Sequence, residues 1–350
     1  VYVNRIPGQL HEGESPEQFA GRIHGRLANQ EGRVQLKLPP GMNRAAYRGF
    51  KAFLGPEGKT TKSNCVACHS PPGFEVSSTK SLRDLIIEKE IPRVYIGSLD
   101  DNPLVGGRGV ERLEKNGIKV ETGVLERECR LLNKRFFAFH QKKRPYIILK
   151  WAESADGFIF PSEETSSNGG PVWISNIHSR QLVHKWRAEE ASILVGTRTV
   201  EQDDPALTVR DFKGSEILRL VIDRKGKLNP ESNVFKGTNP TVVFTDGEKA
   251  HPIFTENKGK YVHFIPLEFD KNLPEQIANH LFEAEIQSLI VEGGAVTLNS
   301  FIDAGLWDEA RVFRGSGVFN HGIEAPKMTQ EASEEQDIHG DLLLRFFNRR

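Results

Sequence analysis

The stretch that decides the fold of the C-terminal part of this chain is VEGGAVTLNSFI, residues 291–302. An acid and two glycines here connect a β-rich run, Ser288 to Val291, to the pattern of an amphipathic helix. Glycine lets a backbone approach a ligand closely, and the free N–H groups at the start of a helix bind phosphate. The stretch therefore predicts a strand–turn–helix unit that suits a phosphorylated ligand.

The sequence before this unit predicts further alternation of strands and helices. Two stretches precede it in order: RPYIILKWAESADGFI from Arg144 and DDPALTVR from Asp203. A helical pattern at Ile177–Glu189 follows the capping candidates Ser175 and Asn176. Apolar runs predict strands at Tyr146–Trp151, Ser192–Val195, Leu218–Ile222, Thr241–Phe244, Val262–Ile265, Ser288–Val291 and Ala310–Phe313. Residues 144–350 are thus expected to form an α/β domain.

The N-terminal part of the chain divides at about residue 80. Residues 1–80 are polar and rich in loop signals, with one expected helix at Asn43–Leu54. Residues 81–143 have a βαβ rhythm, with strands expected at Arg93–Gly97 and Lys119–Thr122 and a helix at Gly109–Asn116, which implies a parallel sheet. The GGRG at Gly106–Gly109 lacks the remainder of a dinucleotide fingerprint and is predicted to be a loop.

Composition and charge limit the classes of partner. At 350 residues the chain is long enough for two or three domains with their own cores. Its 47 basic and 47 acidic residues give a formal net charge of +0, which argues against nucleic acid and membrane surfaces as partners. No apolar run has the length of a membrane span, the N-terminus has no signal-peptide core, and three cysteines cannot form a disulfide framework. These features predict a cytoplasmic protein.

From about Ser81 to Arg350 the ordered motifs resemble the bifunctional deaminase-reductase family of riboflavin biosynthesis, and residues 144–350 resemble its reductase half. The resemblance implies a dihydrofolate-reductase-like fold. It also implies that NADPH reduces the ribosyl group of a phosphorylated aminopyrimidine to ribityl at C1′, in an enzyme that assembles as a homo-oligomer through its reductase domains. The nicotinamide supplies the hydride, so the protein has to hold donor and acceptor carbons together.

The resemblance also implies which residues form the site, without assigning a catalytic residue or a metal. Substrate contacts fall on Lys150, Arg187, Leu207, Arg210 and Glu292. Arg187 and Arg210 suit a 5′-phosphate because guanidinium groups bind it through paired hydrogen bonds. Cofactor contacts fall on Ala152, Trp173, Thr199, Asp203, Gly294, Ala295, Val296, Thr297, Leu298, Asn299 and Ser300.

Each of these signals has a structural alternative when it is taken alone. Asp203-Asp204-Pro205 and Gly293-Gly294 could be simple turns, and Trp173 and Trp186 could be core residues. Two positions depart from the family pattern: Pro171 replaces a substrate-contacting serine, and Arg224 replaces a small residue near NADP. The first change puts one hydrogen bond in doubt, and the second could add a contact to a cofactor phosphate.

The segment at 81–143 resembles the C-terminal half of the family's zinc deaminase. Deaminase chemistry needs a His-x-Glu motif and a Pro-Cys motif, with zinc on His and two Cys and the Glu moving protons. No His in this sequence is followed two residues later by Glu, and no Cys is preceded by Pro. We therefore expect a deaminase remnant that packs but does not deaminate.

A different motif lies before that remnant. Cys65, Cys68 and His69 form CxxCH, the attachment pattern of c-type haem, within a segment that resembles a fragment of a dihaem-peroxidase-type cytochrome c. Haem attachment takes place outside the cytosol, which conflicts with NADPH chemistry. The leading prediction is an NADPH-dependent 5-amino-6-(5-phosphoribosylamino)uracil reductase. Four alternatives stay open beside it: a haem-binding electron carrier, a segment that never carries haem, an incomplete zinc site and a chimeric chain without integrated function.

Overall fold

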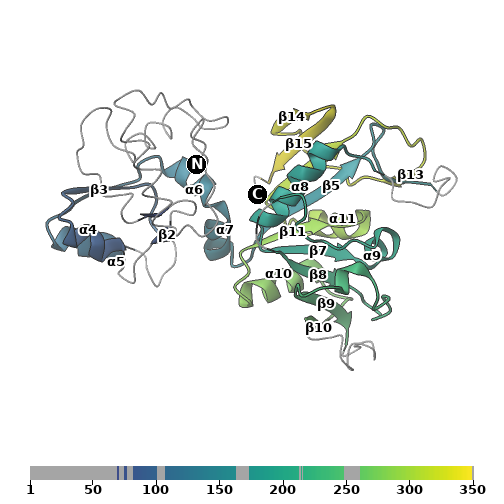
Figure 1. Cartoon of the computed structure of the whole chain (residues 1–350), viewed down its shortest axis with the longest axis horizontal. Coiled ribbons are helices and arrows are strands. Elements are labelled where there is room, and N and C mark those ends of the chain that lie inside the picture. Colours follow the sequence, from purple (N-terminus) through teal and green to yellow (C-terminus); the bar gives the residue numbers. More distant parts are fainter. Residues whose placement is uncertain are drawn as a thin grey trace, which may run out of the picture. The chain divides into compact units, whose positions relative to one another are not determined.

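The computed structural model describes residues 82–100, 107–162, 173–212, 214, 216–247 and 261–348, and the two short strands at 69–70 and 75–76. By its internal contacts the chain divides into two units, Val1–Glu126 and Arg127–Arg350, and each is treated by itself (Figure 1). Among these described residues no helix combines the length and the apolar character that crossing a bilayer requires.

The first unit contains a small parallel βαβ arrangement. β3 (Arg93–Ile96) pairs in parallel with β4 (Lys119–Thr122), and α5 (Arg108–Lys115) connects them, as the sequence predicted. α4 (Leu82–Glu88) packs on α5, and Asp84 pairs with Arg112 across that contact. β1 (His69–Ser70) and β2 (Glu75–Val76) form a separate antiparallel pair.

One sequence prediction in this unit needs correction. The end of the GGRG run is not a loop, because Arg108 and Gly109 form the first turn of α5. Gly107 is the N-cap of that helix and has a φ of 74°, a conformation that favours glycine. The predicted helix at Asn43–Leu54 lies outside the described residues.

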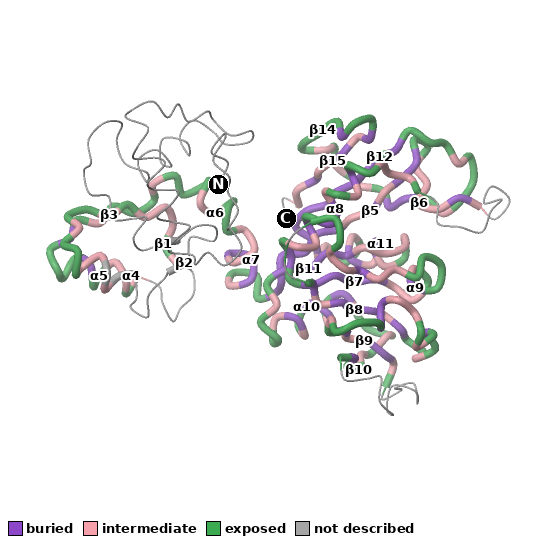
Figure 2. The backbone as a smooth tube through the Cα atoms, viewed as in Figure 1, coloured by how far each residue is buried: buried purple, intermediate pink, exposed green. Residues whose placement is uncertain are grey.

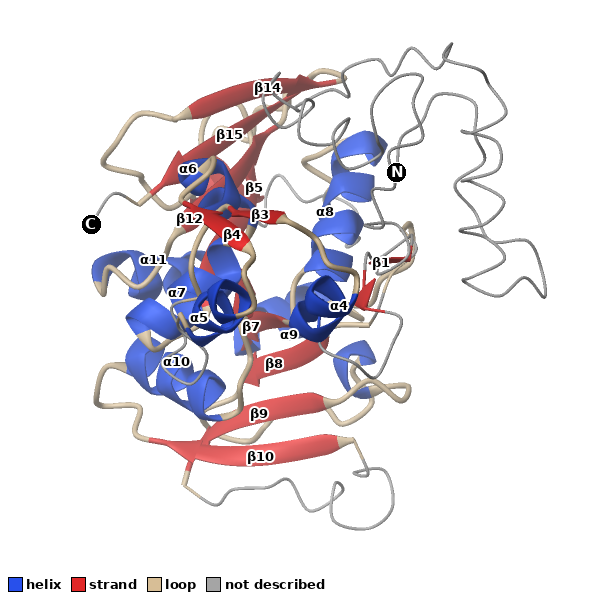
Figure 3. Cartoon of the chain, turned by 90° about the vertical axis from the view of Figure 1, so that its left-hand side faces the viewer, coloured by secondary structure: helices blue, strands red, loops and turns tan. Residues whose placement is uncertain are grey.

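The second unit is built on a nine-stranded sheet in the order β10-β9-β8-β7-β11-β5-β12-β15-β14, which runs from bottom to top in Figure 3. From β10 to β12 every neighbouring pair is parallel, whereas β15 is antiparallel to β12 and to β14. The strands of the sheet are β5 (Tyr146–Glu153), β7 (Ser192–Gly196), β8 (Leu218–Ile222), β9 (Thr241–Asp246), β10 (Val262–Leu267), β11 (Ser288–Glu292), β12 (Glu309–Arg314), β14 (Glu334–Ile338) and β15 (Asp341–Phe347). The seven strands predicted from the sequence are confirmed to within two residues at each end, while β14 and β15 were not predicted.

Helices cover both faces of this sheet. Side chains alternate along β5, so that Ile148 joins one buried cluster and Ile147 and Leu149 join another. Val183 and Trp186 of α8 complete the first cluster, and residues of α10 and α11 complete the second. Figure 2 shows the buried residues concentrated on the central strands. The helices of this unit are α6 (Glu126–Leu132, whose first residue is counted in the first unit), α7 (Lys134–Lys142), α8 (Ile177–Glu189), α9 (Thr197–Asp203), α10 (Leu273–Glu283) and α11 (Ala295–Asp303), with a 3₁₀ turn at Asn233–Phe235. β6 (Phe158–Pro161) and β13 (Gly322–Glu324) form a separate antiparallel two-stranded sheet.

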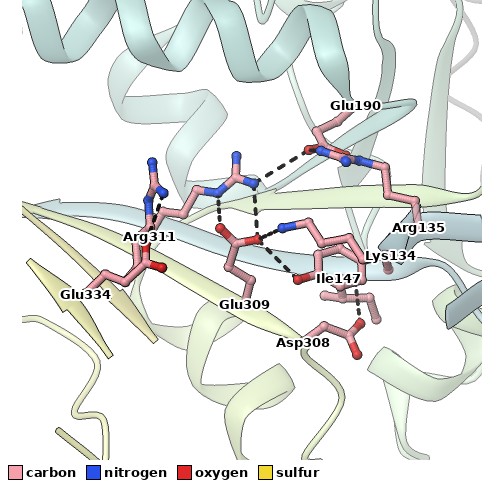
Figure 4. Close-up of polar contacts among 10 residues, drawn as sticks. Lys134, Arg135, Ile147, Glu190, Asp308, Glu309, Arg311 and Glu334 are labelled. Atoms are coloured by element: carbon pink, nitrogen blue, oxygen red, sulfur yellow. Dashed lines mark hydrogen bonds and ion pairs between the residues drawn. The ribbon is translucent and has the colours of Figure 1, made fainter. Parts of the chain in front are cut away.

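A buried charge network attaches α7 to the sheet (Figure 4). Lys134 Nζ lies 2.6 Å from Glu309 Oε2, and Arg135 Nε donates to Glu190 Oε2 at 2.6 Å. Arg311 Nε also donates to Glu309, at 2.7 Å. Lys142 and Arg144 share Asp308 just before β12. By these contacts α7 belongs with the nine-stranded sheet, although sequence analysis placed it in the segment 81–143.

Candidate active site

The C-terminal ends of parallel strands gather the predicted substrate residues. β5, β11 and β7 are adjacent and parallel, so their carboxyl ends lie at one edge of the sheet. Lys150 of β5 and Glu292, the last residue of β11, are register partners on that edge. Ligands of parallel α/β sheets bind outside this edge, which makes it the candidate site.

α8 adds an arginine to this pair. Arg187 Nη2 lies 2.7 Å from Glu292 Oε2, and Arg187 Nε donates to Glu292 Oε1 at 3.3 Å. Lys150 Nζ lies 3.7 Å from the same Oε2. All three side chains are nearly buried. The predicted residues Lys150, Arg187 and Glu292 therefore form one compact ionic cluster.

The cluster controls the charge state of its members. Burial opposes ionisation of Glu292, but the charges of Arg187 and Lys150 outweigh it and lower the pKa of Glu292 to about 2. Burial also lowers the pKa of Lys150, while Glu292 acts in the opposite direction. Glu292 is consequently an ionised hydrogen-bond acceptor near neutral pH, and Lys150 gives up its proton more readily than a solvated lysine.

The start of α11 lies beside this edge and is open. Gly294 is the N-cap, and its N–H donates to Thr199 Oγ1 of α9 at 3.0 Å. Val296 in the first turn is 85% exposed. A Cβ on Gly196, at the end of β7, would lie 2.7 Å from Thr297 Oγ1, so the two helix starts pack too closely for a side chain there. The predicted cofactor run thus begins at an accessible helix N-terminus that α9 holds in place.

The DDPALTVR stretch forms the end of α9 and a fixed loop. α9 ends at Asp203, and Asp204 caps it with a φ of 40°. The Asp204 carboxylate accepts two hydrogen bonds from Asn233, both at 2.7 Å. Leu207 has a φ of 52° and packs in the core. Asp203 and Asp204 therefore end a helix in a turn, which is the structural alternative considered for them in the sequence analysis. The role of Asp203 in cofactor binding stays a prediction.

Arg210 in this loop presents its side chain to solvent. The Arg210 backbone N–H donates to His184 Nδ1 at 3.2 Å. Within the described part of the chain its guanidinium has no hydrogen-bonding or ionic partner. Arg187, by contrast, is engaged by Glu292. Of the two arginines expected at a phosphate, Arg210 is the one left available.

Trp173 is an exposed aromatic residue in the segment that leads into α8. Its side chain is 66% exposed, so the alternative that it is a core residue is wrong, whereas Trp186 is buried in the core. The guanidinium of Arg180 lies 5.7 Å from the centre of the Trp173 ring and also pairs with Asp211 at 3.0 Å. The helix itself is capped by Asn176, whose side chain accepts from two backbone N–H groups.

The remaining predicted residues fall at the margin of the cluster or outside the described residues. Ala152 is half-buried on β5, two residues beyond Lys150. Arg224 follows β8 and pairs with Asp246 at 3.2 Å. Pro171, Cys65 and Cys68 lie outside the described residues, and His69 is described only as part of β1.

A separate cavity lies on the opposite face of the sheet. It has a volume of about 470 Å³ and is lined by residues that include Trp151, Glu153 and Arg314. Trp151 and Glu153 alternate along β5 with Lys150 and Ala152 and point the other way. None of the predicted site residues lines this cavity.

The sequence analysis missed His184, which connects the buried cluster to the Arg210 loop. A signal was present, because His184 precedes Arg187 by three residues and therefore shares its face of α8. It also missed Asp211, whose carboxylate joins Arg180 and approaches His184. Neither residue carries a motif that would single it out.

The fold and this edge of the sheet define an α/β enzyme domain whose ligands bind at the carboxyl ends of parallel strands. The model of the RibD C-terminal domain matches residues 145–338, more than half of the chain, and the chain belongs to this family. The α/β class expected for residues 144–350 is thereby confirmed, as is the resemblance to the deaminase-reductase of riboflavin biosynthesis.

Individual relatives extend the match beyond that domain. The chain is 35% identical over 285 residues to the riboflavin biosynthesis protein RibD of Aquifex aeolicus, which covers 81% of this chain and 77% of the relative. RibD of Bacillus amyloliquefaciens is 33% identical over 244 residues, with 69% and 64% covered. The crystal structure of a diaminohydroxyphosphoribosylaminopyrimidine deaminase/5-amino-6-(5-phosphoribosylamino)uracil reductase from Thermotoga maritima superposes with a TM-score of 0.66 at 31% identity, covering 76% of this chain and 74% of that one.

Proposed function

We propose that this chain is an NADPH-dependent 5-amino-6-(5-phosphoribosylamino)uracil reductase that carries no deaminase activity. The observation that carries the proposal is the Lys150–Arg187–Glu292 cluster at the carboxyl edge of the sheet, in a chain of the RibD C-terminal domain family. The Thermotoga relative is a 5-amino-6-(5-phosphoribosylamino)uracil reductase, and this is the activity that the edge suits.

The residues at the start of α11 and beside it fit a nicotinamide dinucleotide. The N–H groups of an open helix N-terminus suit a pyrophosphate. Elsewhere, in the segment before α8, the exposed ring of Trp173 offers a flat contact surface. Thr199 fixes the helix start through Gly294. When bound, NADPH would supply the hydride, and the chain's part is to bind it and to hold its nicotinamide against the substrate.

The cluster suits the sugar end of the substrate. Ionised Glu292 would accept hydrogen bonds from ribosyl hydroxyl groups, and Arg187 and Lys150 hold its carboxylate in one orientation. Burial lowers the pKa of Lys150, which would favour proton transfer from this amine to the sugar. Arg210, exposed and unpaired within the described residues, would bind the 5′-phosphate.

The absence of deamination is proposed from the sequence. His-x-Glu and Pro-Cys motifs are missing from all 350 residues, so the groups that hold zinc and move protons in such deaminases have no counterpart here. A separate deaminase would then supply the substrate.

The test is NADPH oxidation by the purified chain with the deaminated pyrimidine and, in parallel, with its undeaminated precursor. We expect turnover of the deaminated compound only. Turnover of the precursor with release of ammonia would contradict the loss of deamination, and no oxidation with either compound would contradict the reductase proposal.

Haem attachment at Cys65, Cys68 and His69 is not part of this proposal, because it rests on the CxxCH motif alone. We expect both thiols to be unmodified, which intact-mass measurement after expression with a haem-maturation system would check. The homo-oligomer and the cytoplasmic location stay predictions, the first measurable by light scattering of the purified chain.

A further inference from the structure

His184 lies between the buried cluster and the exposed arginine loop. Its side chain is on α8, one turn before Arg187, and is 2% exposed. Nδ1 accepts the Arg210 N–H at 3.2 Å, and Nε2 lies 3.7 Å from Asp211 Oδ2. One imidazole thus contacts two consecutive residues of the loop that follows Leu207.

We propose that His184 is a positioning residue that holds the Arg210 backbone so that its guanidinium can bind the substrate phosphate. This inference rests on the proposed function, since it assigns the phosphate to Arg210. The guanidinium has no partner of its own within the described residues, so its location is set by the backbone that carries it. The hydrogen bond to His184 fixes that backbone directly at Arg210.

The arrangement requires a neutral imidazole. Nδ1 accepts a hydrogen bond, so the ring proton is on Nε2, toward Asp211. Burial, followed by the charge of Arg187 on the same helix, lowers the pKa of His184. Arg210 acts in the same direction, while Asp211 from the loop and Glu292 from β11 oppose it. Protonation would put a donor on Nδ1 and remove the acceptor of the Arg210 N–H.

The rest of the loop is held independently of His184. Asp204 binds Asn233, and the Val209 N–H donates to Glu216. Leu207 is buried in the core. Loss of the His184 acceptor should therefore release Arg210 locally and leave the loop in place.

The experiment compares His184→Leu, which removes the acceptor, with His184→Asn, whose amide oxygen can take the place of Nδ1. His178→Leu, an exposed position on the same helix, is the control. For His184→Leu we expect the KM of the phosphorylated substrate to rise about tenfold, with kcat and the KM of NADPH changed less than about twofold. His184→Asn should recover most of the loss, and His178→Leu should resemble the wild type.

A binding measurement separates failure of this inference from failure of the proposed function. The Kd of ribose 5-phosphate, measured by calorimetry without turnover, should rise in His184→Leu, and added ribose should give no signal that depends on the variant. A wild-type protein that binds ribose 5-phosphate in a His184-dependent way but does not oxidise NADPH would support the inference and remove the proposed reaction.

Three outcomes would overturn the inference. One is an equal rise in both KM values, which indicates a general structural role. Another is a Kd for ribose 5-phosphate that is the same in His184→Leu and wild type. If His184→Leu does not fold, the decision falls to the pH profiles of the wild type and His184→Asn. As the pH falls, protonation of the phosphate affects both proteins, so the KM of the phosphorylated substrate should rise more in the wild type, whose imidazole titrates. Identical profiles would contradict the role.

Discussion

The charge network beneath α7 yields a quantitative prediction for Glu309→Gln. Glu309 is the first residue of β12, and its side chain is 3% exposed. Its carboxylate contacts Lys134 at 2.6 Å, Arg311 at 2.7 Å and the Tyr146 hydroxyl at 3.2 Å (Figure 4). The substitution keeps the shape of the side chain and removes the charge. It leaves the half-buried Lys134 without its carboxylate and the buried Arg311 with only the more distant Glu190, at 3.8 Å.

The expected loss of folding free energy in Glu309→Gln follows from the ionisation of this carboxyl group. Burial opposes ionisation, but the hydrogen bond and charge of Arg311, followed by Lys134, lower the pKa of Glu309 from 4.5 to about 2. At about 1.4 kcal/mol per pKa unit, the native environment stabilises the ionised form by about 3 kcal/mol. Removing one member of a buried ion pair costs roughly 3–5 kcal/mol, which agrees. In a unit of this size the melting temperature should fall by roughly 6–12 °C.

Thermal unfolding followed by tryptophan fluorescence is the assay. All four tryptophans of the chain lie at positions 151, 173, 186 and 307, so the signal reports on the second unit. Glu334→Gln is the matched control, because Glu334 pairs with Arg345 at the surface and is 55% exposed. The reasoning is refuted if Glu309→Gln melts within about 1 °C of the wild type, or if the control loses as much stability.

The same pKa shift predicts how the stability difference between wild type and Glu309→Gln changes with pH. The native pKa of Glu309 is lower than the unfolded value, so its stabilisation is complete above pH 4.5 and is lost as the pH falls from 4.5 toward 2. The stability difference between wild type and Glu309→Gln should shrink over that window. A difference that stays constant there would show that the charge is not its source.

Three further substitutions test the site. Gly196→Ala places a methyl group 2.7 Å from Thr297 Oγ1, so it should lower the free energy of unfolding by about 1–3 kcal/mol in urea titrations. Adding Thr297→Ala should restore most of that loss. A double variant as unstable as Gly196→Ala would contradict the close approach. Thr199→Val removes the acceptor of the Gly294 N–H and should raise the Kd of NADPH several-fold by fluorescence titration, whereas an unchanged Kd would detach this contact from cofactor binding. Arg210→Lys should raise the KM of the phosphorylated substrate far more than that of NADPH, and equal changes in steady-state kinetics would remove the phosphate role.

Much of the second unit could be predicted from the sequence because its signals are local. Apolar runs marked the parallel strands, and the helix at Ile177–Glu189 was predicted with the bounds it has. Hairpin strands were missed for the same reason: β14 is EEQDI, and four of its five residues are exposed, so it has no apolar run. Its place in the sheet comes from pairing with β15.

In the candidate site, too, the sequence predicted which residues take part, whereas contacts between distant parts of the chain decided how they are arranged. Motif order identified Lys150, Arg187 and Glu292, and the strand register and α8 brought Lys150 and Arg187 each within 4 Å of Glu292. No local pattern distinguishes Arg187, which faces Glu292, from Arg210, which faces solvent. That difference depends on which strand end lies beside each arginine.

By itself, then, the sequence determined the positions of the core strands, the family and the identity of the residues at the sheet edge. Only the tertiary structure decided that α7 belongs to the sheet through Lys134 and Glu309, and that His184 holds Arg210. The physical reason is that propensity and periodicity act between near neighbours, whereas burial of a charge depends on partners distant along the chain. Lys134 and Glu309 are 175 residues apart, and in sequence each resembles an ordinary surface charge.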